Sequence, residues 1–355
     1  MKTMWSDCLK AIDAANRVAV FMHCNADGDA IGSAYALAAA LLRGGKAVCV
    51  FTEEIFEEKL SFLVYDKAAT AYLGLPLPGG GVDEDFCFLN GAEASGFNAD
   101  VGIAVDCATA GRMSPACRAV FEGCPVKIKI DHHLPCEGSE FADINISDPK
   151  WAATAEGLWQ LIALYCDGKR CDAPDYDIAV RLYTAILTDT GRFVYTNTTG
   201  NTLRTAAELV DITGTDLNWI ARRTYDIKKP RVVKLLAEGY AKAESFFEGK
   251  VIFLILEKED FERAGALISD SNVLPPELMN VEGAEISVFA KPSGQTSGSG
   301  ETSYKISMRS TKRYNVACIC SLFGGGGHAC SAGCTFYGCA EELKKKILEE
   351  IGKII

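Results

Sequence analysis

The chain has 355 residues, of which 48% are hydrophobic and 23% charged; this composition is ordinary for a globular protein with two cores. Its net charge of −11 argues against a protein that tracks long nucleic acid, because such proteins need a broad basic surface for phosphate contacts. No apolar run approaches the length of a membrane span, and the apolar stretch near the N-terminus is too short for a signal peptide.

Short β-branched segments alternate with helical patterns in the first half of the chain, which predicts an α/β fold with a parallel sheet. The predicted strands are Val18–Met22, Ala47–Phe51, Val101–Val105 and Val126–Ile130. The predicted helices are Ala30–Arg43, Ser114–Glu122, Ala152–Cys166 and Asp175–Thr188. Successive residues of these strands are apolar at both odd and even positions, so we expect both faces of the sheet to be covered. Pro76–Gly81 is expected to be a loop.

A helical stretch from about Thr202 to Ser245, interrupted at Gly214 and Pro230, is expected to join this half to a second α/β region. The basic residues between 222 and 234 fit either a solvated helix face or a local groove. The second region is predicted to contain strands at Val251–Leu256, Glu285–Ala290 and Tyr304–Met308, helices at Val316–Phe323 and Glu341–Ile351, and a flexible loop at Ser293–Gly300. We therefore expect domains at residues 1–200 and 246–355, joined by a connector at 201–245.

All four histidines lie in short segments rich in aspartate or glycine. His23, Asp27 and Asp29 fall between the first predicted strand and its helix, where open α/β sheets bind ligands. Imidazole and carboxylate together suit a divalent ion such as Mn²⁺, Fe²⁺, Co²⁺ or Zn²⁺. The alternative is a capped helix start with Asp29 as the N-cap residue, and this segment alone does not decide between the two.

Asp106 and Asp131 each follow a predicted strand, which brings both carboxylates to the sheet edge where His23 is expected. His132 and His133 add two imidazoles there. Adjacent side chains of an extended segment point in opposite directions, so we expect one of the two to bind metal and the other to face substrate. A single Asp at a strand end is usually a cap, but three strands converging on one edge favour a metal site.

Two further motifs are weaker when taken alone. Asp189 lies where a predicted helix gives way to a glycine turn, and ordinary turn chemistry is its default interpretation. His328 follows four glycines, Gly324–Gly327, whose N–H groups can bind an anion if the segment is not simply a flexible turn.

In this order the motifs resemble those of the DHH phosphoesterase family. The matching segments are His23 to Ser33, Val105-Asp106 with Arg112, Asp131-His132-His133, and Thr188 to Phe193. The second half resembles the family's DHHA1 substrate domain through Arg309-Ser310 and Phe323 to His328. The branch that the chain resembles most is the stand-alone nano-RNase and pAp phosphatase branch, although Ala26 stands where relatives usually have proline.

The resemblance implies a site for two Mn²⁺ ions, with Fe²⁺, Co²⁺ or Mg²⁺ as substitutes. The implied metal ligands are His23, Asp27 and Asp106 for one ion, and Asp29, Asp106, His132 and Asp189 for the other. The implied catalytic residues are Asp106 as the bridge, His133 facing the phosphate, and Asp131, which orients the imidazoles. The implied substrate-binding residues are Arg112, His133, Arg309, Ser310, Gly325, Gly326, Gly327 and His328.

These features predict a metal-dependent phosphoesterase of the cytoplasm, with its active site between the two domains. Its expected substrates are short RNA and pAp-type nucleotides, without a long nucleic-acid track or a membrane partner; a homodimer is left open. The alternatives are a cyclic- or linear-dinucleotide phosphodiesterase, a manganese pyrophosphatase and a non-catalytic nucleotide-binding module. The fifteen cysteines are expected to be reduced thiols and not a disulfide framework.

Overall fold

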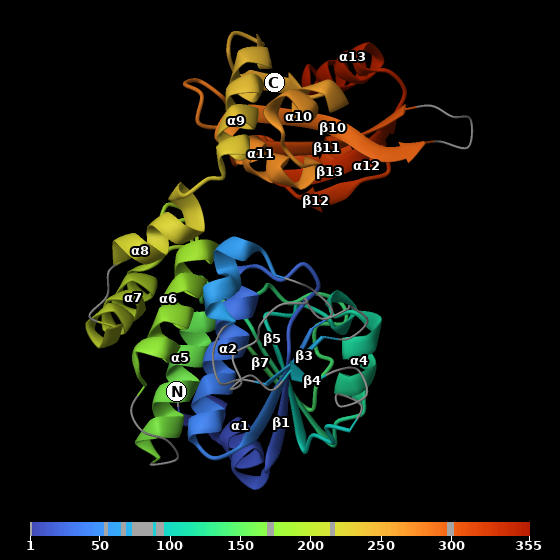
Figure 1. Ribbon diagram of the computed structural model, residues 1–355. Helices are drawn as coiled ribbons and strands as arrows, with labels where there is room; N and C mark the ends of the chain where they lie inside the picture. Colours follow the sequence, from blue (N-terminus) through green and yellow to red (C-terminus); the bar gives the residue numbers. More distant parts are fainter. Residues whose placement is uncertain are drawn as a thin grey trace. The chain divides into compact units, whose positions relative to one another are not determined.

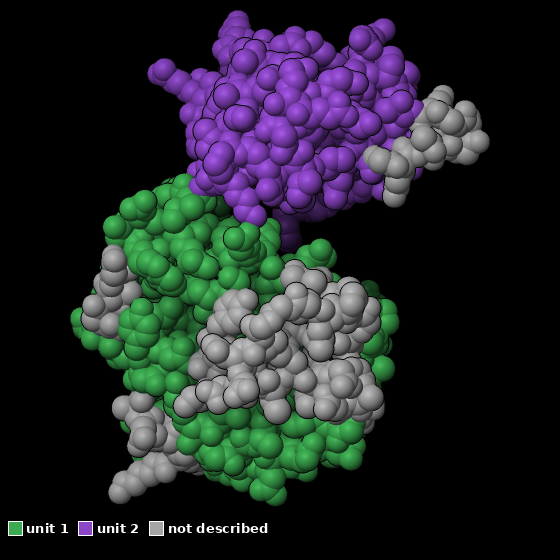
Figure 2. All heavy atoms as spheres, in the orientation of Figure 1, with its two compact units in different colours: residues 1–227 green, residues 228–355 purple. Residues whose placement is uncertain are grey.

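The structure, a computed structural model, describes residues 2–52, 56–64, 69–72, 88–89, 96–168, 174–213, 217–296 and 302–355. The chain forms two compact units, residues 1–227 and 228–355 (Figure 2). The division falls inside the expected connector, whose first part belongs to unit 1 and whose remainder belongs to unit 2. The expected loop Pro76–Gly81 lies outside the described residues. No helix in the described ranges is long and apolar enough to cross a membrane.

Within the described residues of unit 1, a seven-stranded parallel sheet has the order β4-β3-β2-β1-β5-β6-β7 (Figure 1). Its strands are β1 (Arg17–Phe21), β2 (Ala47–Thr52), β3 (Ala69–Tyr72), β4 (Phe88–Leu89), β5 (Val101–Val105), β6 (Val126–Asp131) and β7 (Ile144–Ser147). The parallel α/β architecture is the one predicted from the sequence. The strand order reverses between β1 and β5, and ligands of open parallel sheets bind outside the carboxyl ends of strands at such a reversal.

Helices pack against both faces of this sheet (Figure 1). The longer ones are α1 (Lys2–Ala14), α2 (Gly28–Arg43), α4 (Pro115–Glu122), α5 (Thr154–Asp167), α6 (Tyr176–Asp189) and α7 (Gly200–Thr213). The short ones are α8 (Leu217–Ala221), the 3₁₀ helices η1 (Glu58–Leu63) and η2 (Ala110–Arg112), and the π-helical turn η3 (Arg222–Asp226).

Helix α2 is buried along nearly its whole length, because small residues let its neighbours approach closely. A Cβ added at Gly32 would lie 2.6 Å from the carbonyl oxygen of Arg181 in α6, so the two helices pack backbone to backbone. A side chain at Gly28 would likewise overlap Thr188, near the end of α6. The start of α2 and the end of α6 are therefore held together.

Unit 2 contains a mixed sheet whose order is β12-β13-β11-β10-β9-β8 in the described residues. Its strands are β8 (Glu244–Phe246), β9 (Val251–Ile255), β10 (Ile286–Thr296), β11 (Thr302–Ser310), β12 (Gly326–His328) and β13 (Ser331–Tyr337). Its helices are α9 (Pro230–Lys242), α10 (Lys258–Ala264), η4 (Ile268–Val273), α11 (Leu274–Leu278), α12 (Val316–Leu322) and α13 (Ala340–Ile351). Two apolar clusters cover its faces, one with α12 and α13 and the other with α9, α10 and α11.

Three expectations need adjustment. Strand β10 continues to Thr296, so the expected loop Ser293–Gly300 begins later than its composition predicts. The end of the glycine run is an edge strand, β12, and not a turn, because Gly326–His328 pair with β13. Cys166 is disulfide-bonded, whereas twelve other described cysteines are free thiols, as expected.

Candidate metal centre

His23 is the second residue after β1, and its side chain is almost fully buried. Its Nδ1 is 2.8 Å from the carbonyl oxygen of Cys24, which can only accept a hydrogen bond, so Nδ1 carries the proton. Nε2 then points at carboxylates, 3.5 Å from Asp106 Oδ2 and 4.0 Å from Asp27 Oδ1. Burial opposes protonation, but the hydrogen bond with Asp106 prevails and raises the pKa of His23 to about 9. The imidazole is thus oriented as a metal ligand requires.

Asp27 is the N-cap residue of α2, because its Oδ1 accepts hydrogen bonds from the amides of Asp29 (3.0 Å) and Ala30 (3.1 Å). This corrects the alternative interpretation in which Asp29 is the cap. Asp29 is instead fully buried in the first turn, where its carboxylate accepts from the Ser33 hydroxyl and from the amides of Thr154 and Ala155. Burial, followed by the charge of Asp106, raises the pKa of Asp29 well above its usual value.

Asp106 follows β5 with a φ of 55°, a left-handed conformation that non-glycine residues adopt rarely and that is common at functional sites. Its amide donates to the Ile130 carbonyl (3.0 Å), which fixes this conformation against β6. The buried carboxylate accepts from the Thr154 hydroxyl (3.1 Å) and also lies 3.5 Å from His132 Nε2. Burial opposes ionisation, but the hydrogen bond from His23 and the nearby histidine charges lower the pKa of Asp106.

Asp131, the last residue of β6, joins a buried lysine to a histidine. Its Oδ2 lies 3.0 Å from Lys129 Nζ, and both side chains are almost inaccessible to solvent. Its Oδ1 accepts from His133 Nδ1 at 2.7 Å. Burial opposes the charged carboxylate, yet His133 and Lys129 lower the pKa of Asp131 to about 2. The same hydrogen bond raises the pKa of His133.

His132, which directly follows β6, and Asp189, the last residue of α6, complete the cluster. His132 Nε2 is 3.6 Å from Asp189 Oδ2 and 3.5 Å from Asp106 Oδ1. Burial, then the charges of Asp106 and Asp27, raise the pKa of Asp189 to about 7. The carboxylates are thus crowded enough for one of them to retain a proton near neutrality.

Among the described residues, three groups of side chains converge closely enough to hold a metal ion. The groups are His23, Asp27 and Asp106; Asp29, His132 and Asp189; and Asp106, His132 and His133. Asp106 and His132 each belong to two of these groups, so the pair links the whole cluster. Asp106 directly follows β5, which lies beside the reversal in strand order. It is therefore at the edge of the sheet where a ligand is predicted to bind.

Arg112 is the exposed last residue of η2, and its carbonyl accepts from the Cys24 amide at 2.8 Å. The backbone of Arg112 is therefore tied to the loop that carries His23.

In unit 2, strand pairing aligns Arg309 of β11 with Ser331 of β13, and Ser331 with His328 of β12. Directly opposed residues of antiparallel strands share a face, so these three side chains form one row. Ser310 points to the other face, where its hydroxyl donates to the Tyr314 carbonyl (2.8 Å). The structure does not bring Ser310 into the row.

The glycines beside this row differ in their surroundings. A Cβ at Gly325 or Gly327 would overlap the backbone of β13, whereas a Cβ at Gly326 would meet nothing within 4 Å. A ligand can therefore approach Gly326 from the side on which a side chain would lie.

Sequence reasoning gave no role to two residues of the first cluster. Thr154 bonds to both Asp29 and Asp106, but it belongs to a helix start 125 residues from Asp29 in sequence. Lys129 lies in a strand that we expected to be apolar on both faces. Because Lys129 is two residues before Asp131, the two side chains lie on one side of β6. A lysine in an otherwise apolar strand, at this spacing from an aspartate, is the feature that could have revealed the ion pair.

Comparison with known proteins agrees with this organisation. Residues 17–186 match the model of the DHH family N-terminal domain, and residues 248–355 match the DHHA1 domain. The chain is 30% identical over 351 residues to the bifunctional oligoribonuclease and PAP phosphatase NrnA of Thermus thermophilus, covering 98% of this chain and 92% of that protein. It is 27% identical over 211 residues to the Bacillus subtilis protein of that name, covering 59% and 62% of the two chains.

A solved structure supports the fold. The exopolyphosphatase-related protein of Bacteroides fragilis superposes with a TM-score of 0.81 at 24% identity, covering 99% of this chain and 96% of that one.

Proposed function

The chain belongs to the DHH family of phosphoesterases, and we propose that it is a manganese-dependent hydrolase of short oligoribonucleotides and pAp-type nucleotides. Members of this family depend on metal ions. The similarity to two bifunctional oligoribonuclease and PAP phosphatases supports the substrate class. The observation that carries the proposal is the convergence of carboxylates and imidazoles around the buried side chain of Asp106.

The donor set fits divalent cations. Four carboxylates and three imidazoles converge in unit 1, and their crowding is expressed in the raised pKa values of Asp29 and Asp189. Such buried negative charge needs cations. In our assignment His23, Asp27 and Asp106 hold one ion, and Asp29, Asp106, His132 and Asp189 hold the other. Imidazole ligands favour Mn²⁺, Fe²⁺ or Co²⁺ over Mg²⁺. When bound, two such ions lower the pKa of water and stabilise charge on phosphoryl oxygens.

The surrounding residues orient the reacting groups. Thr154 holds Asp29 and Asp106 in place through its amide and its hydroxyl. Asp131 directs the imidazole of His133, and the raised pKa of His133 favours a cation there that can pair with a phosphate oxygen. Arg112 provides a second cation near the His23 loop.

The row in unit 2 is proposed to bind a part of the substrate distant from the reacting phosphate. Arg309, His328 and the backbone of Gly326 can together bind a second phosphate. Ser310 is proposed to act through the backbone of β11, because its hydroxyl is engaged with Tyr314.

One assay tests the function. Purified protein with Mn²⁺ is offered pAp, RNA of roughly two to five nucleotides and a 24-nucleotide RNA, together with cyclic di-AMP, linear pApA and pyrophosphate. We expect turnover of pAp and of the shortest RNA, with weak binding of the long RNA even at low salt, because the net charge of −11 offers no basic track. Hydrolysis of only cyclic di-AMP or pyrophosphate, or processive digestion of the long RNA, would contradict the proposal.

A further inference from the structure

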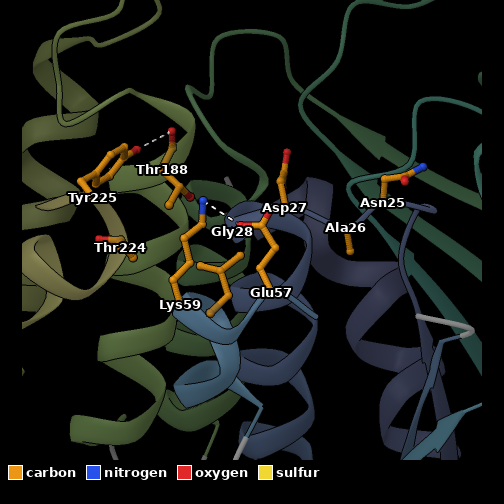
Figure 3. A pocket seen from close by; sticks show the side chains of 10 residues that line it. Asn25, Ala26, Asp27, Gly28, Glu57, Lys59, Thr188, Thr224 and Tyr225 are labelled. Carbon is orange, nitrogen blue, oxygen red and sulfur yellow. Dashed lines mark hydrogen bonds and ion pairs between the residues drawn. The ribbon is translucent and has the colours of Figure 1, made fainter. Parts of the chain in front are cut away.

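A cavity of about 230 Å³ opens beside the metal-binding cluster of unit 1 (Figure 3). Its wall is formed by the loop of residues 25–28, the start of η1, Thr188 of α6 and the last part of η3. Asp27 belongs to both the cluster and the cavity, and Thr188 directly precedes Asp189. A group bound in this cavity therefore lies next to the reacting phosphate of the proposed function, which assigns the cavity no role.

The volume of the cavity limits its occupant. Sites for drug-sized molecules usually measure about 300–1,000 Å³, so this one suits a single sugar or base and not a dinucleotide. Its wall is held firmly. The Tyr225 hydroxyl donates to the Thr188 carbonyl at 3.1 Å, and the Arg192 guanidinium lies 4.8 Å from the centre of the Tyr225 ring.

The charges in the wall disfavour a second phosphate. The side chains that carry a formal charge in this wall are two carboxylates, Asp27 and Glu57, and one ammonium group, Lys59. Lys59 is paired with Glu57, and Asp27 is assigned to a metal ion, so the lining side chains offer an anion no uncommitted positive charge. A neutral group that donates hydrogen bonds is favoured instead, and the hydroxyls of a ribose are such donors.

Glu57 is the carboxylate best suited to accept such a bond. It holds the N-cap position of η1 without bonding to the helix amides, and its Oε2 lies 2.8 Å from Lys59 Nζ. Figure 3 shows this ion pair between Thr188 and Asp27. Both side chains are at least half exposed, so their pairing contributes little to stability and leaves the second carboxylate oxygen accessible to a ligand.

We propose that this cavity binds the ribose attached to the reacting phosphate, and that Glu57 accepts a hydrogen bond from its 2′-hydroxyl. This inference rests on the proposed function and makes Glu57 a determinant of specificity for ribonucleotides over 2′-deoxyribonucleotides. A site built to bond a hydroxyl rejects the analogue that lacks it, because the partner is then left unsatisfied. The 2′-hydroxyl is the group by which proteins distinguish RNA from DNA.

Binding tests the inference independently of turnover. Calorimetry with Mn²⁺ compares AMP with 2′-deoxy-AMP on the full chain. We expect AMP to bind about tenfold more tightly, the effect of one hydrogen bond to a charged group. Glu57→Ala should remove this preference by weakening AMP binding alone, and Glu57→Gln, which retains an acceptor, should keep part of it.

Glu58→Ala is the matched control, because it removes the same charge one residue along η1 at a position that does not line the cavity. The preference for AMP should survive in this variant. Equal binding of the two ligands by the unaltered protein overturns the inference, as does an undiminished preference in folded Glu57→Ala or an equal loss in Glu58→Ala.

Kinetics separate this inference from the proposed function. With pAp and its 2′-deoxy analogue, we expect the preference to appear in kcat/KM and to vanish in Glu57→Ala, at unchanged manganese content. Hydrolysis of both substrates at equal rates refutes the ribose site and leaves the proposed function standing. If neither substrate is hydrolysed, the proposed function is refuted, and the comparison of AMP with 2′-deoxy-AMP binding still decides the ribose site.

Discussion

At the scale of single residues, Asp106 has the most connections in the candidate centre. It contacts His23 on one oxygen and both Thr154 and His132 on the other. The left-handed φ of Asp106 costs backbone free energy, which the surrounding bonds must offset.

Asp106→Ala should therefore remove ligand atoms from both proposed ions at once. We expect manganese content to fall at both sites and kcat/KM to drop by about 10³-fold or more, since metal ions supply several kcal/mol of transition-state stabilisation. Elemental analysis and steady-state kinetics measure the two effects. Full turnover by this variant, or by the unaltered protein in EDTA, would rule out the two-metal assignment.

Lys129 acts on the site through Asp131. Lys129→Met should leave a buried carboxylate without its cation, which costs about 3–5 kcal/mol of stability. It should also lower kcat about 10- to 100-fold through the position of His133, while manganese content stays constant.

Lys127→Met is the control for this change, because Lys127 lies on the same strand but pairs with Asp143 near the surface. If both variants lose kcat to the same extent, or if Lys129→Met loses its metal, the lysine does not act through His133.

At the scale of elements, the glycine run joins the end of α12 to β12, and its members have different reasons to be glycine. Gly327 has a φ of 140° and lies against Ser331 and Ala332, whereas Gly326 faces open space.

Gly327→Ala should consequently lower the melting temperature of unit 2, because the added methyl group strains the backbone and collides with β13. Gly326→Ala should leave the melting temperature unchanged but raise KM severalfold, because its methyl group covers the amide proposed to bind substrate. Differential scanning calorimetry and kinetics separate the two. A large loss of stability in Gly326→Ala would show that this glycine is structural.

Much of the element pattern was predictable, because buried strands are marked by apolar runs and helices by caps. Strands β1, β2, β5 and β6 lie within a residue of their expected bounds. Helix α1 was missed although Trp5, Cys8 and Ile12 have helical spacing. Strand β13 was missed although its buried residues alternate with less buried ones, because several of them are too small to give a strong apolar signal.

The motifs of the candidate metal centre could be predicted from their residue types and their strand-end positions. Thr154 and Glu57 could not, since their roles depend on contacts between segments far apart in the chain, which periodicity does not encode.

At the scale of the whole molecule, the cluster of charges links metal binding to stability. His23 has a pKa of about 9 in the folded chain, against about 6.5 in an unfolded one. Without metal, the folded chain therefore holds an extra proton between these values, and its stability falls as the pH rises through that window. Asp189, with a pKa of about 7 and an unfolded value near 3.9, acts in the same direction at lower pH.

EDTA-treated protein should accordingly melt at a lower temperature at pH 9 than at pH 6. The increase in melting temperature produced by Mn²⁺ should be larger at pH 9, because the cation no longer competes with protons. Thermal scans across this range, with and without Mn²⁺, measure both trends. The lowered pKa of Asp131, about 2, affects stability only in acid and does not alter them. A metal-induced shift that shrinks with rising pH would contradict this account.

The close packing of α2 on α6 has a consequence for protein engineering. Replacing helical glycines with alanine is a common route to thermostable variants, because alanine restricts the unfolded chain. At Gly28 and Gly32 the same change would push α6 away, and Asp189 would move with it. A design that treats these two glycines as neutral surface choices would thus separate the two helices and disturb the candidate metal centre without replacing any of its proposed ligands.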